Sequence, residues 1–402
     1  MSVNGLSSRE VQIASLATQL ASAFELVAED ADHKKAVTIL AAAGGTGGHI
    51  VPALEVAREL RERGHHCVFV GTGRELERRL TSAAGFPLEA LRSGPLNQVS
   101  LATKISTLLR LPGALLDAWR LIGYYRPAAV LSLGGYASGP LAAAAWLRGI
   151  PIVALEPNAY PGMANRLIGP VVARALTGIR ETEKYFRRSG TETIGAPVRK
   201  EFFEIPIKKH TEPLMILVTG GSQGARTLNR AAAEAVQLWA QNGASKSLRI
   251  LHQAGKADAG RLQLEYASVE SGSVQAEAVE FLDDMPAAFA AADVVISRAG
   301  ASTVGELCAA GCASILVPYP HAADDHQTHN AEALASAGGA KVVSDAEWNG
   351  ARMVQEIESL LSVPGRLEQM EKAARGLAQP GAARRAADVL EEVAGRNRRK
   401  ES

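Results

Sequence analysis

The stretch VTILAAAGGTGGHIVPALEVAREL at residues 37–60 decides the fold, because its layout returns as LMILVTGGSQGARTLNRAAAEAV at residues 214–236. In both, a short apolar strand leads into a glycine-rich turn, and a helix follows. This layout is typical of a parallel sheet, which binds ligands beyond the carboxyl ends of its strands. The first helix is expected to hold Pro52 in its first turn. Two copies of the layout predict two Rossmann-like domains.

Further short apolar runs continue the pattern, at residues 67–70, 128–133, 150–155, 248–252, 278–282, 293–297 and 313–318. The predicted fold class is α/β, with two Rossmann-like domains that face a cleft. The predicted organisation is a helical extension at 1–35, domains at 36–196 and 197–375, and a helix at 376–402 that packs back on the N-terminal domain. The amphipathic extension suits either packing on a domain surface or contact with a partner or membrane.

The composition excludes several classes of protein. The chain of 402 residues has a formal net charge of +1, so no nucleic-acid partner is expected. Its 3 cysteines form no disulfide framework and indicate a reducing compartment. No apolar run reaches the roughly 18 residues that a spanning helix needs, and the first residues do not resemble a signal peptide. Any work at a membrane is therefore expected to take place from its surface.

Two loops in the C-terminal half have the character of a nucleotide site. The turn GGSQGA at 220–225 opens a helix whose free N–H groups suit a diphosphate, although a purely structural turn has the same features. The turn SRAGASTVGE at 297–306 repeats this design. Its Glu306 has two interpretations: it completes a capping box with Thr303, or its carboxylate accepts hydrogen bonds from a ribose.

The polar loop at 318–330 follows the last predicted strand. Gln327 both donates and accepts hydrogen bonds, which suits sugar hydroxyls. Asp325 and His329 lie four residues apart, so a metal site is conceivable, but a plain polar loop explains the spacing equally well.

In the N-terminal half, three loops each follow a predicted apolar strand. GGTGGH at 44–49 ends in His49, which is either a general base or a histidine that bonds the backbone at a helix entry. GGYASGP at 134–140 and EPNAYPGMANR at 156–166 complete this side. Asn158 and Asn165 suit a polar substrate, although asparagine is also common in plain turns.

Six motifs together resemble the MurG family of peptidoglycan N-acetylglucosaminyltransferases: GGTGGH, GGYASGP, NAYPGMANR (158–166), GAPVR (195–199), GGSQGAR (220–226) and RAGASTVGE (298–306). They occur in the family's order over residues 36–395. The resemblance implies the GT-B fold, the donor UDP-N-acetylglucosamine, and lipid I, undecaprenyl-diphospho-muramoyl pentapeptide, as acceptor. No cofactor is expected, and no metal either, because helix N-termini can stabilise the leaving UDP and the Asp-x-Asp motif at residues 30–32 lies outside the predicted core. The resemblance also implies work on the cytoplasmic face of the plasma (inner) membrane, as a peripheral protein, with other cell-wall synthesis proteins as partners.

The resemblance also assigns residues. It implies a diphosphate contact at Ser222, uracil contacts at Arg199 and Leu282, ribose binding by Glu306 and sugar recognition by Gln327. The donor-binding turn comprises Ala301, Ser302, Thr303, Val304, Gly305 and Glu306. The acceptor side and cleft comprise Thr46, Gly47, Gly48, His49, Asn158, Gly135, Tyr136, Ser138 and Asn165.

The sequence departs from the family at two places. Leu155-Glu156-Pro157-Asn158 stands where the family usually has His-Glu-Gln-Asn, which leaves Asn158 but removes the histidine and the glutamine. Asparagine is common where Ala196 stands.

An α-linked donor and a β-linked product require inversion, with a base that takes the proton of the acceptor 4-hydroxyl. His49 is the candidate base. A basic amphipathic segment from Leu101 to Arg126 suits docking to an anionic membrane surface, and core packing of its apolar residues is the alternative. Two other functions are weighed against transfer: a UDP-sugar epimerase, and a catalytically silent sugar-nucleotide-binding module.

Overall fold

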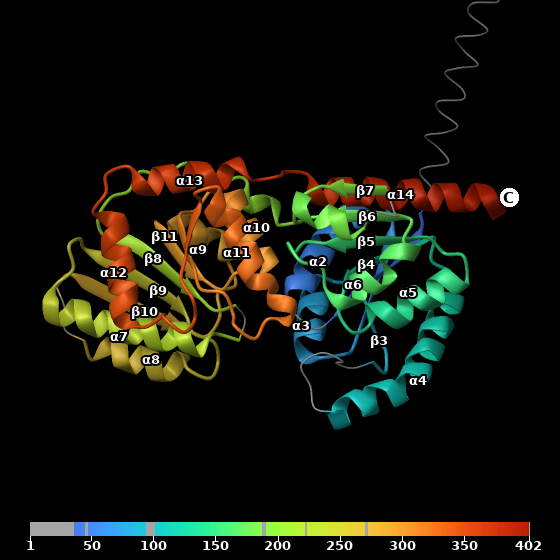
Figure 1. Cartoon of the computed structure of the whole chain (residues 1–402), viewed down its shortest axis with the longest axis horizontal. Helices are drawn as coiled ribbons and strands as arrows, with labels where there is room; N and C mark the ends of the chain where they lie inside the picture. Colours follow the sequence, from blue (N-terminus) through green and yellow to red (C-terminus); the bar gives the residue numbers. More distant parts are fainter. Residues whose placement is uncertain are drawn as a thin grey trace, which may run out of the picture.

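The computed structural model describes residues 36–44, 47–93, 101–186, 190–221, 223–269 and 272–401. The chain forms two lobes that lie side by side, each built on a twisted parallel sheet with helices on both faces (Figure 1). The predicted α/β class and the two Rossmann-like domains are confirmed. The predicted extension at 1–35 lies outside the described residues. No helix in the described part of the chain is long and apolar enough to cross a membrane.

The N-terminal sheet has 7 strands in the order β3-β2-β1-β4-β5-β6-β7. Its strands are β1 Thr38–Ala43, β2 His66–Gly71, β3 Leu88–Ala90, β4 Ala129–Gly134, β5 Ile152–Glu156, β6 Arg174–Thr177 and β7 Gly190–Thr193. Its helices are α2 Gly47–Glu62, α3 Glu75–Ala83, α4 Leu101–Tyr125, α5 Ser138–Leu147 and α6 Met163–Ile168, with 3-10 turns η1 Gly169–Val171 and η2 Arg180–Tyr185.

The C-terminal sheet has 6 strands in the order β10-β9-β8-β11-β12-β13. Its strands are β8 Leu214–Thr219, β9 Leu248–Gln253, β10 Val274–Val279, β11 Val294–Ser297, β12 Ser314–Leu316 and β13 Ala340–Val342. The helices are α7 Arg226–Asn242, α8 Ala259–Ala267, α9 Met285–Ala291, α10 Ala301–Ala310, α11 His326–Ser336, α12 Gly350–Leu361, α13 Arg366–Gly376 and α14 Ala382–Glu401, with 3-10 turns η3 Lys200–Phe202 and η4 Ala323–Asp325.

In both sheets the chain starts at a central strand, moves outward to one edge and then crosses to the other side, which is the Rossmann order. The two crossover points lie at β1/β4 and β8/β11. In sheets of this order, the connections after the two strands run to opposite sides, and ligands bind in the crevice between them. The glycine-rich turns at 44–49 and 220–225 follow β1 and β8, so both stand at these points.

Two sequence expectations about local structure were wrong. Helix α2 begins at Gly47, so Pro52 lies inside the helix rather than in its first turn. The helix starts early because it grows directly out of the glycine turn, and this places His49 within its first turn. The strand expected at 278–282 instead spans Val274–Val279, because alternate exposed residues such as Gln275 and Glu277 hid this edge strand from a search for apolar runs.

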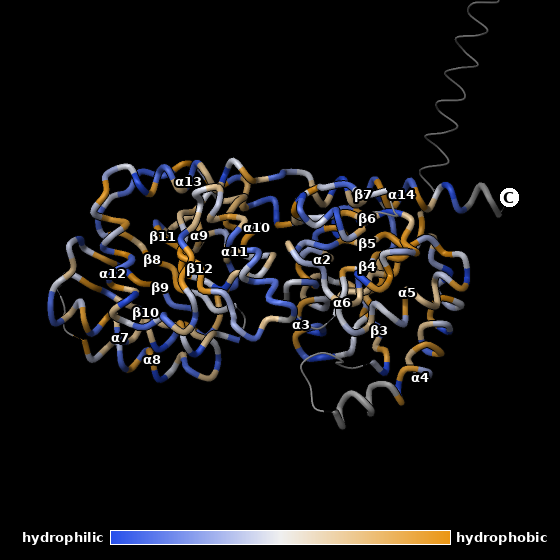
Figure 2. Tube along the Cα trace, viewed as in Figure 1, coloured by the Kyte–Doolittle hydropathy of each residue, from blue (hydrophilic) through white to orange (hydrophobic). Residues whose placement is uncertain are grey.

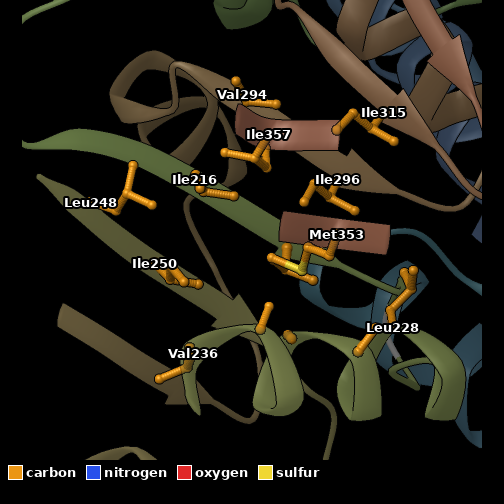
Figure 3. Packing of buried hydrophobic residues seen from close by; sticks show 14 of the residues in the cluster. Ile216, Leu228, Val236, Leu248, Ile250, Val294, Ile296, Ile315, Met353 and Ile357 are labelled. Carbon is orange, nitrogen blue, oxygen red and sulfur yellow. The ribbon is translucent and has the colours of Figure 1, made fainter. Parts of the chain in front are cut away.

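The core of each lobe lies between its sheet and the flanking helices. Apolar residues follow the strands in both lobes (Figure 2). In the C-terminal lobe, Leu228 and Val236 of α7 and Met353 and Ile357 of α12 pack on strand residues such as Ile216 (Figure 3). Ile194 is buried in the core of the N-terminal lobe, whereas Val198 is buried in a core cluster of the C-terminal lobe, so the chain passes from one lobe to the other between these two residues.

The last helix returns to the N-terminal lobe. After α13, the chain crosses the interface, and α14 packs on α2, β4 and β5 (Figure 1). Val389, Leu390 and Val393 of α14 belong to the N-terminal core. Arg63, which directly follows α2, also donates to Asp388, at 2.7 Å from Nη1 to Oδ1. The N-terminal lobe is therefore built from two distant segments of the chain.

Candidate active site

The acceptor-side turn is closed by a backbone contact between two glycine-rich loops. Gly135 has a φ of +82°, and a Cβ at this position would lie 2.1 Å from the carbonyl oxygen of Gly44. Only glycine allows so close an approach. The contact places the loop after β4 against the start of α2, where the N–H groups of Gly47 and Gly48 begin the helix. Thr46, also expected here, lies outside the described residues.

His49 is half-buried in the first turn of α2. Burial lowers its pKa to about 4, and the charge of His326 lowers this pKa further, while a hydrogen bond with the backbone of Gly44 opposes the shift. His326 is the first residue of α11 in the other lobe. His49 thus faces the C-terminal domain and is a neutral imidazole near pH 7, the form that accepts a proton.

A buried carboxylate organises the loop that follows β5. Glu156 is fully buried, and its Oε1 accepts from the backbone N–H and the Nδ2 of Asn158 at 3.1 and 2.8 Å. Its Oε2 accepts from the N–H of Gly162 and from Nδ2 of Asn165 at 3.0 and 3.1 Å. Burial raises the pKa of Glu156, and these hydrogen bonds oppose the rise. The carboxylate fixes the fold of the loop.

The two asparagines expected on the acceptor side therefore differ. Asn165 is fully buried, and its Oδ1 accepts from Ser132 at 3.1 Å, so in this structure it holds the loop and touches no open space. Asn158 lies at the interface between the lobes, where its Oδ1 accepts from Nδ2 of Asn330 at 3.1 Å. Ser138 is also buried, with its hydroxyl donating to the carbonyl of Gly134 at 2.6 Å.

Tyr136 is the acceptor-side residue with a partly open ring. The guanidinium of Arg74 lies 5.3 Å from the centre of this ring. Arg74 is exposed and directly precedes α3. A cation and an aromatic ring thus flank the loop that closes on Gly44.

On the donor side, the turn at 220–225 packs against the residues at the end of β9. A Cβ on Gly224 would lie 2.0 Å from the carbonyl oxygen of Ala254, so the turn needs glycine at this φ of +71°. Gln253 donates to the carbonyl of Gly221 at 2.9 Å and accepts from the N–H of Leu282 at 3.3 Å. One side chain therefore holds the glycine turn and the loop of Leu282 together. Ser222 lies outside the described residues.

The third turn leads directly into α10. The helix begins at Ala301 with Gly300 as its N-cap, so Thr303 and Glu306 do not form a capping box and that interpretation is wrong. Ser302 Oγ is buried and has no hydrogen-bond partner among the described residues, and the same holds for Ser297 Oγ at the end of β11. Two unsatisfied hydroxyls beside a helix N-terminus are suited to an anionic ligand. Val304 is buried in the core, and Gly305 packs on Ala196 and Val198.

Glu306 lies on the face of α10 that meets α2. Burial raises its pKa to about 7, the positive charge of Arg199 lowers it, and the negative charge of Glu55 on α2 raises it. Burial also raises the pKa of Glu55. Arg199 lies at the end of the linker between the lobes, with its guanidinium 5.2 Å from the ring of Phe202. The lobes thus bring two carboxyl groups and one cation together.

Gln327 is the second residue of α11 and faces the start of α10. Its Oε1 accepts from the N–H groups of Ala299 and Tyr319, at 3.2 and 2.9 Å. This leaves the amide nitrogen as the group able to donate to a ligand. Arg298 supports the same loops, donating to the carbonyl of Val317 at 3.0 Å and to Asp345 at 2.6 Å.

The alternative of a metal site in this loop has no geometric support. Asp325 accepts from Thr328 at 2.7 Å, whereas His329 Nδ1 lies 3.5 Å from Glu332 and its ring stacks on Tyr160 of the other lobe, with 6.1 Å between the ring centres. In the described ranges no group of three or more His, Cys, Asp or Glu side chains is arranged to hold a metal.

The sequence did not reveal the residues that hold the loops of the site in place through hydrogen bonds. Gln253, Arg298 and Asn330 each lie directly before or after residues that were singled out, but their partners are distant in the sequence and follow no local spacing. Glu156 was noted only for its neighbours. A polar residue at the carboxyl end of a buried strand, as Glu156 and Gln253 are, is the available signal.

The comparisons with known proteins agree with this geometry. The model described as "Glycosyltransferase family 28 N-terminal domain" matches residues 39–177, and the "Glycosyltransferase family 28 C-terminal domain" matches residues 215–392. Both lobes therefore define a glycosyltransferase of the GT-B type.

The relatives narrow this class. A UDP-N-acetylglucosamine--N-acetylmuramyl-(pentapeptide) pyrophosphoryl-undecaprenol N-acetylglucosamine transferase from Solibacter usitatus is 50% identical over 359 residues, covering 89% of this chain and 97% of the relative. The crystal structure of Acinetobacter baumannii MurG is 30% identical with a TM-score of 0.71, covering 88% of this chain and 99% of that one. The chain belongs to this MurG family of N-acetylglucosamine transferases.

A UDP-GlcNAc 2-epimerase from Neisseria meningitidis, bound to UDP-GlcNAc, also resembles the structure. It is 13% identical with a TM-score of 0.62, and it covers 88% of this chain and 100% of that one. This likeness shows the shared fold alone.

Proposed function

We propose that the protein transfers N-acetylglucosamine from UDP-N-acetylglucosamine to the 4-hydroxyl of the muramoyl sugar of lipid I, which yields lipid II and UDP. The observation that carries the proposal is the meeting of the two turns: His49 of α2 and the α10 turn with Glu306 face the same interface between the lobes. The 50% identity to a transferase named for these substrates supports their identity.

The donor binds on the C-terminal lobe. Glu306 accepts hydrogen bonds from the ribose, and the loops of Arg199 and Leu282 hold the uracil. The N-terminus of α10 and the hydroxyl of Ser302 take the diphosphate, which gives the buried hydroxyl the partner it lacks. Gln327 donates from its amide nitrogen to a hydroxyl of the sugar.

Transfer proceeds by one in-line displacement. His49 takes the proton of the 4-hydroxyl as the hydroxyl oxygen bonds to the anomeric carbon, and the bond from that carbon to the β-phosphate oxygen breaks. UDP leaves with the bonding electrons, and the configuration at the anomeric carbon inverts. The N-termini of α7 and α10 stabilise the charge that develops on the β-phosphate.

The acceptor is a lipid, and the N-terminal lobe offers a surface for the membrane. Exposed apolar residues gather on α4 and on the end of the adjoining α5: Leu109, Leu111, Leu116, Trp119, Trp146 and Leu147. We call them the α4–α5 patch. Arg148 lies 4.1 Å from the ring of Trp119, and Arg110 and Arg120 directly follow Leu109 and Trp119 in the sequence of α4. Exposed apolar side chains with arginines on the same elements suit the surface of an anionic bilayer.

The buried side of α4 is formed by other residues, chiefly Ala114, Ala118 and Ile122, of which the last two belong to a core cluster. The large apolar residues of the predicted amphipathic segment are therefore not all needed for packing: Leu109, Leu116 and Trp119 remain exposed, whereas Leu115 packs against the core. The side chains of Ile105 and Leu108 lie outside the described residues. This supports work at a membrane surface as a peripheral protein, and the lipid acceptor of the proposed reaction makes the cytoplasmic face of the plasma membrane the surface that we propose.

One assay separates the candidate functions. The full chain is incubated with labelled UDP-N-acetylglucosamine and a short-chain lipid I analogue, and the products are separated. A labelled disaccharide lipid supports the proposed transfer. An isomerised UDP-sugar would instead identify an epimerase, and UDP-sugar binding without turnover would identify a silent binding module.

A further inference from the structure

We infer that Asn330 is a positioning residue that aligns the acceptor-side loop with the donor-binding turn. The inference rests on the proposed transfer reaction and adds to it a residue that touches neither substrate. Asn330 lies on α11 at the interface of the two lobes and is 1% exposed.

The amide of Asn330 joins three points in two domains. Its Nδ2 donates to Oδ1 of Asn158 in the N-terminal lobe and to the carbonyl of Ala299 in the C-terminal lobe, both at 3.1 Å. Its Oδ1 accepts from the backbone N–H of Ala159 at 2.8 Å. The amide group of Asn330 therefore makes two hydrogen bonds across the interface, with Asn158 and Ala159, and one within its own lobe, with Ala299.

The orientation of this contact is fixed from the N-terminal side. Glu156 accepts from Nδ2 of Asn158, so Oδ1 is the atom that Asn158 presents to Asn330. A buried carboxylate, an asparagine in each lobe and the carbonyl of Ala299 thus form one continuous chain of hydrogen bonds. Chains of this kind are rigid where every member is satisfied.

The C-terminal end of the chain reaches the donor turn. Ala299 directly precedes Gly300, the N-cap of α10, and α11 holds both of its backbone groups: Asn330 binds the carbonyl, and Gln327 binds the N–H at 3.2 Å. Any displacement of Asn330 would therefore move both the loop of Asn158 and the start of α10. Since a misplacement of about 1 Å costs roughly 100-fold in rate, this alignment matters for kcat.

The test compares Asn330→Ala with the wild-type protein. We expect kcat for transfer to a lipid I analogue to fall at least about tenfold, while the Kd for UDP stays within about twofold because Gln327 still holds the N–H of Ala299 at the start of the donor turn and the proposed UDP contacts all lie in the C-terminal lobe. Spin labels at Glu62→Cys on α2 and Gln263→Cys on α8 should report a broader distance distribution between the lobes. Asn330→Asp, which keeps the side-chain volume, serves if the alanine variant fails to fold.

A matched control breaks a different contact across the same interface. Arg166 on α6 pairs with Asp324 at 2.7 Å, and both side chains are about one-third exposed. Such a pair contributes little, so Asp324→Asn should leave kcat and the distance distribution nearly unchanged.

The inference is wrong if Asn330→Ala keeps kcat within twofold, or if its loss in kcat/KM is matched by an equal loss in UDP affinity. Wild-type protein that makes no lipid II would contradict the transfer reaction itself, whereas UDP affinity and the interlobe distance would still decide the role of Asn330.

Discussion

The negative charge of Glu55 on α2 raises the pKa of Glu306 on α10, although the two residues belong to different domains. Burial contributes most of the shift, which brings the pKa of Glu306 to about 7, and Arg199 partly offsets it. The protonation state of the proposed ribose ligand therefore depends on how the two lobes meet.

This relationship predicts how UDP affinity varies with pH. The ionised carboxylate accepts hydrogen bonds from ribose hydroxyls, so UDP should bind more tightly as the pH rises through about 7. Glu55→Gln removes the charge that raises the pKa of Glu306, so the midpoint should move to lower pH. Calorimetric titration with UDP from pH 5.5 to 8.5 measures both. An identical midpoint in Glu55→Gln would refute the coupling.

The same shift predicts a stability effect. The pKa of Glu306 is about 7 in the folded protein against an ordinary value of 4.5, so the folded state binds this proton more tightly than the unfolded state. Its contribution to stability is complete below pH 4.5 and is lost as the pH rises to about 7, by about 1.4 kcal/mol per pH unit at most. Glu306→Gln cannot ionise and should unfold at a higher temperature than wild type at pH 8. Calorimetry at pH 5 and 8 checks this, and a lower Tm at pH 8 would contradict it.

His49→Ala tests the proposed base. We expect kcat to fall by about 10²–10⁴-fold, with UDP affinity unchanged, because the imidazole acts on the acceptor proton only. His66→Ala is the control, since His66 is exposed at the start of β2, at the opposite end of the sheet. Steady-state assays with a lipid I analogue measure kcat for both. A normal kcat in His49→Ala would remove this residue from the mechanism.

The α4–α5 patch predicts membrane binding. Leu109→Glu places a charge at a side chain that is 77% exposed and should weaken sedimentation with anionic vesicles, and added salt should weaken it further. Leu264→Glu on α8 is the matched control at 74% exposure in the other lobe. Equal losses in the two variants would exclude a specific patch.

Helix α14 should contribute strongly to the stability of the N-terminal lobe. Leu390 is fully buried in that core, so Leu390→Ala is expected to destabilise the lobe by about 2–5 kcal/mol. Leu377→Ala, at a residue that is 43% exposed just before the crossing, should change stability little. Urea unfolding followed by Trp fluorescence measures both. A small effect of Leu390→Ala would mean that α14 is not integral to the domain.

The sequence was sufficient for the parts of this structure that depend on local pattern. Apolar strands followed by glycine turns predicted both sheets and both proposed substrate loops, because the residues that form a βα turn are neighbours in the sequence. The strands β3, β6, β7 and β13 were missed because each has only 3 or 4 residues and includes polar or partly exposed ones, whereas the equally short β11 and β12 are fully buried and lie within apolar runs.

Contacts between distant segments could not be predicted in the same way. Glu156, Asn158 and Asn330 form one network, but nothing in the spacing of 156 and 330 links them. The capping box predicted at Thr303 and Glu306 failed for a related reason. The two residues have the correct spacing, but the helix begins earlier, at Ala301, so Thr303 is not its N-cap. Local spacing identifies candidates, and tertiary packing decides between their roles.

The return of α14 to the N-terminal lobe bears on how the protein is made. A ribosome releases residues 36–194 first, yet the core that they form lacks Val389, Leu390 and Val393 until the end of the chain has emerged. The first domain to be synthesised is thus the last to be completed. Until then, the apolar face of α2 stays exposed to solvent while the whole second domain is translated. A chain truncated near its C-terminal end would therefore fail to complete the N-terminal domain, although that domain is synthesised first.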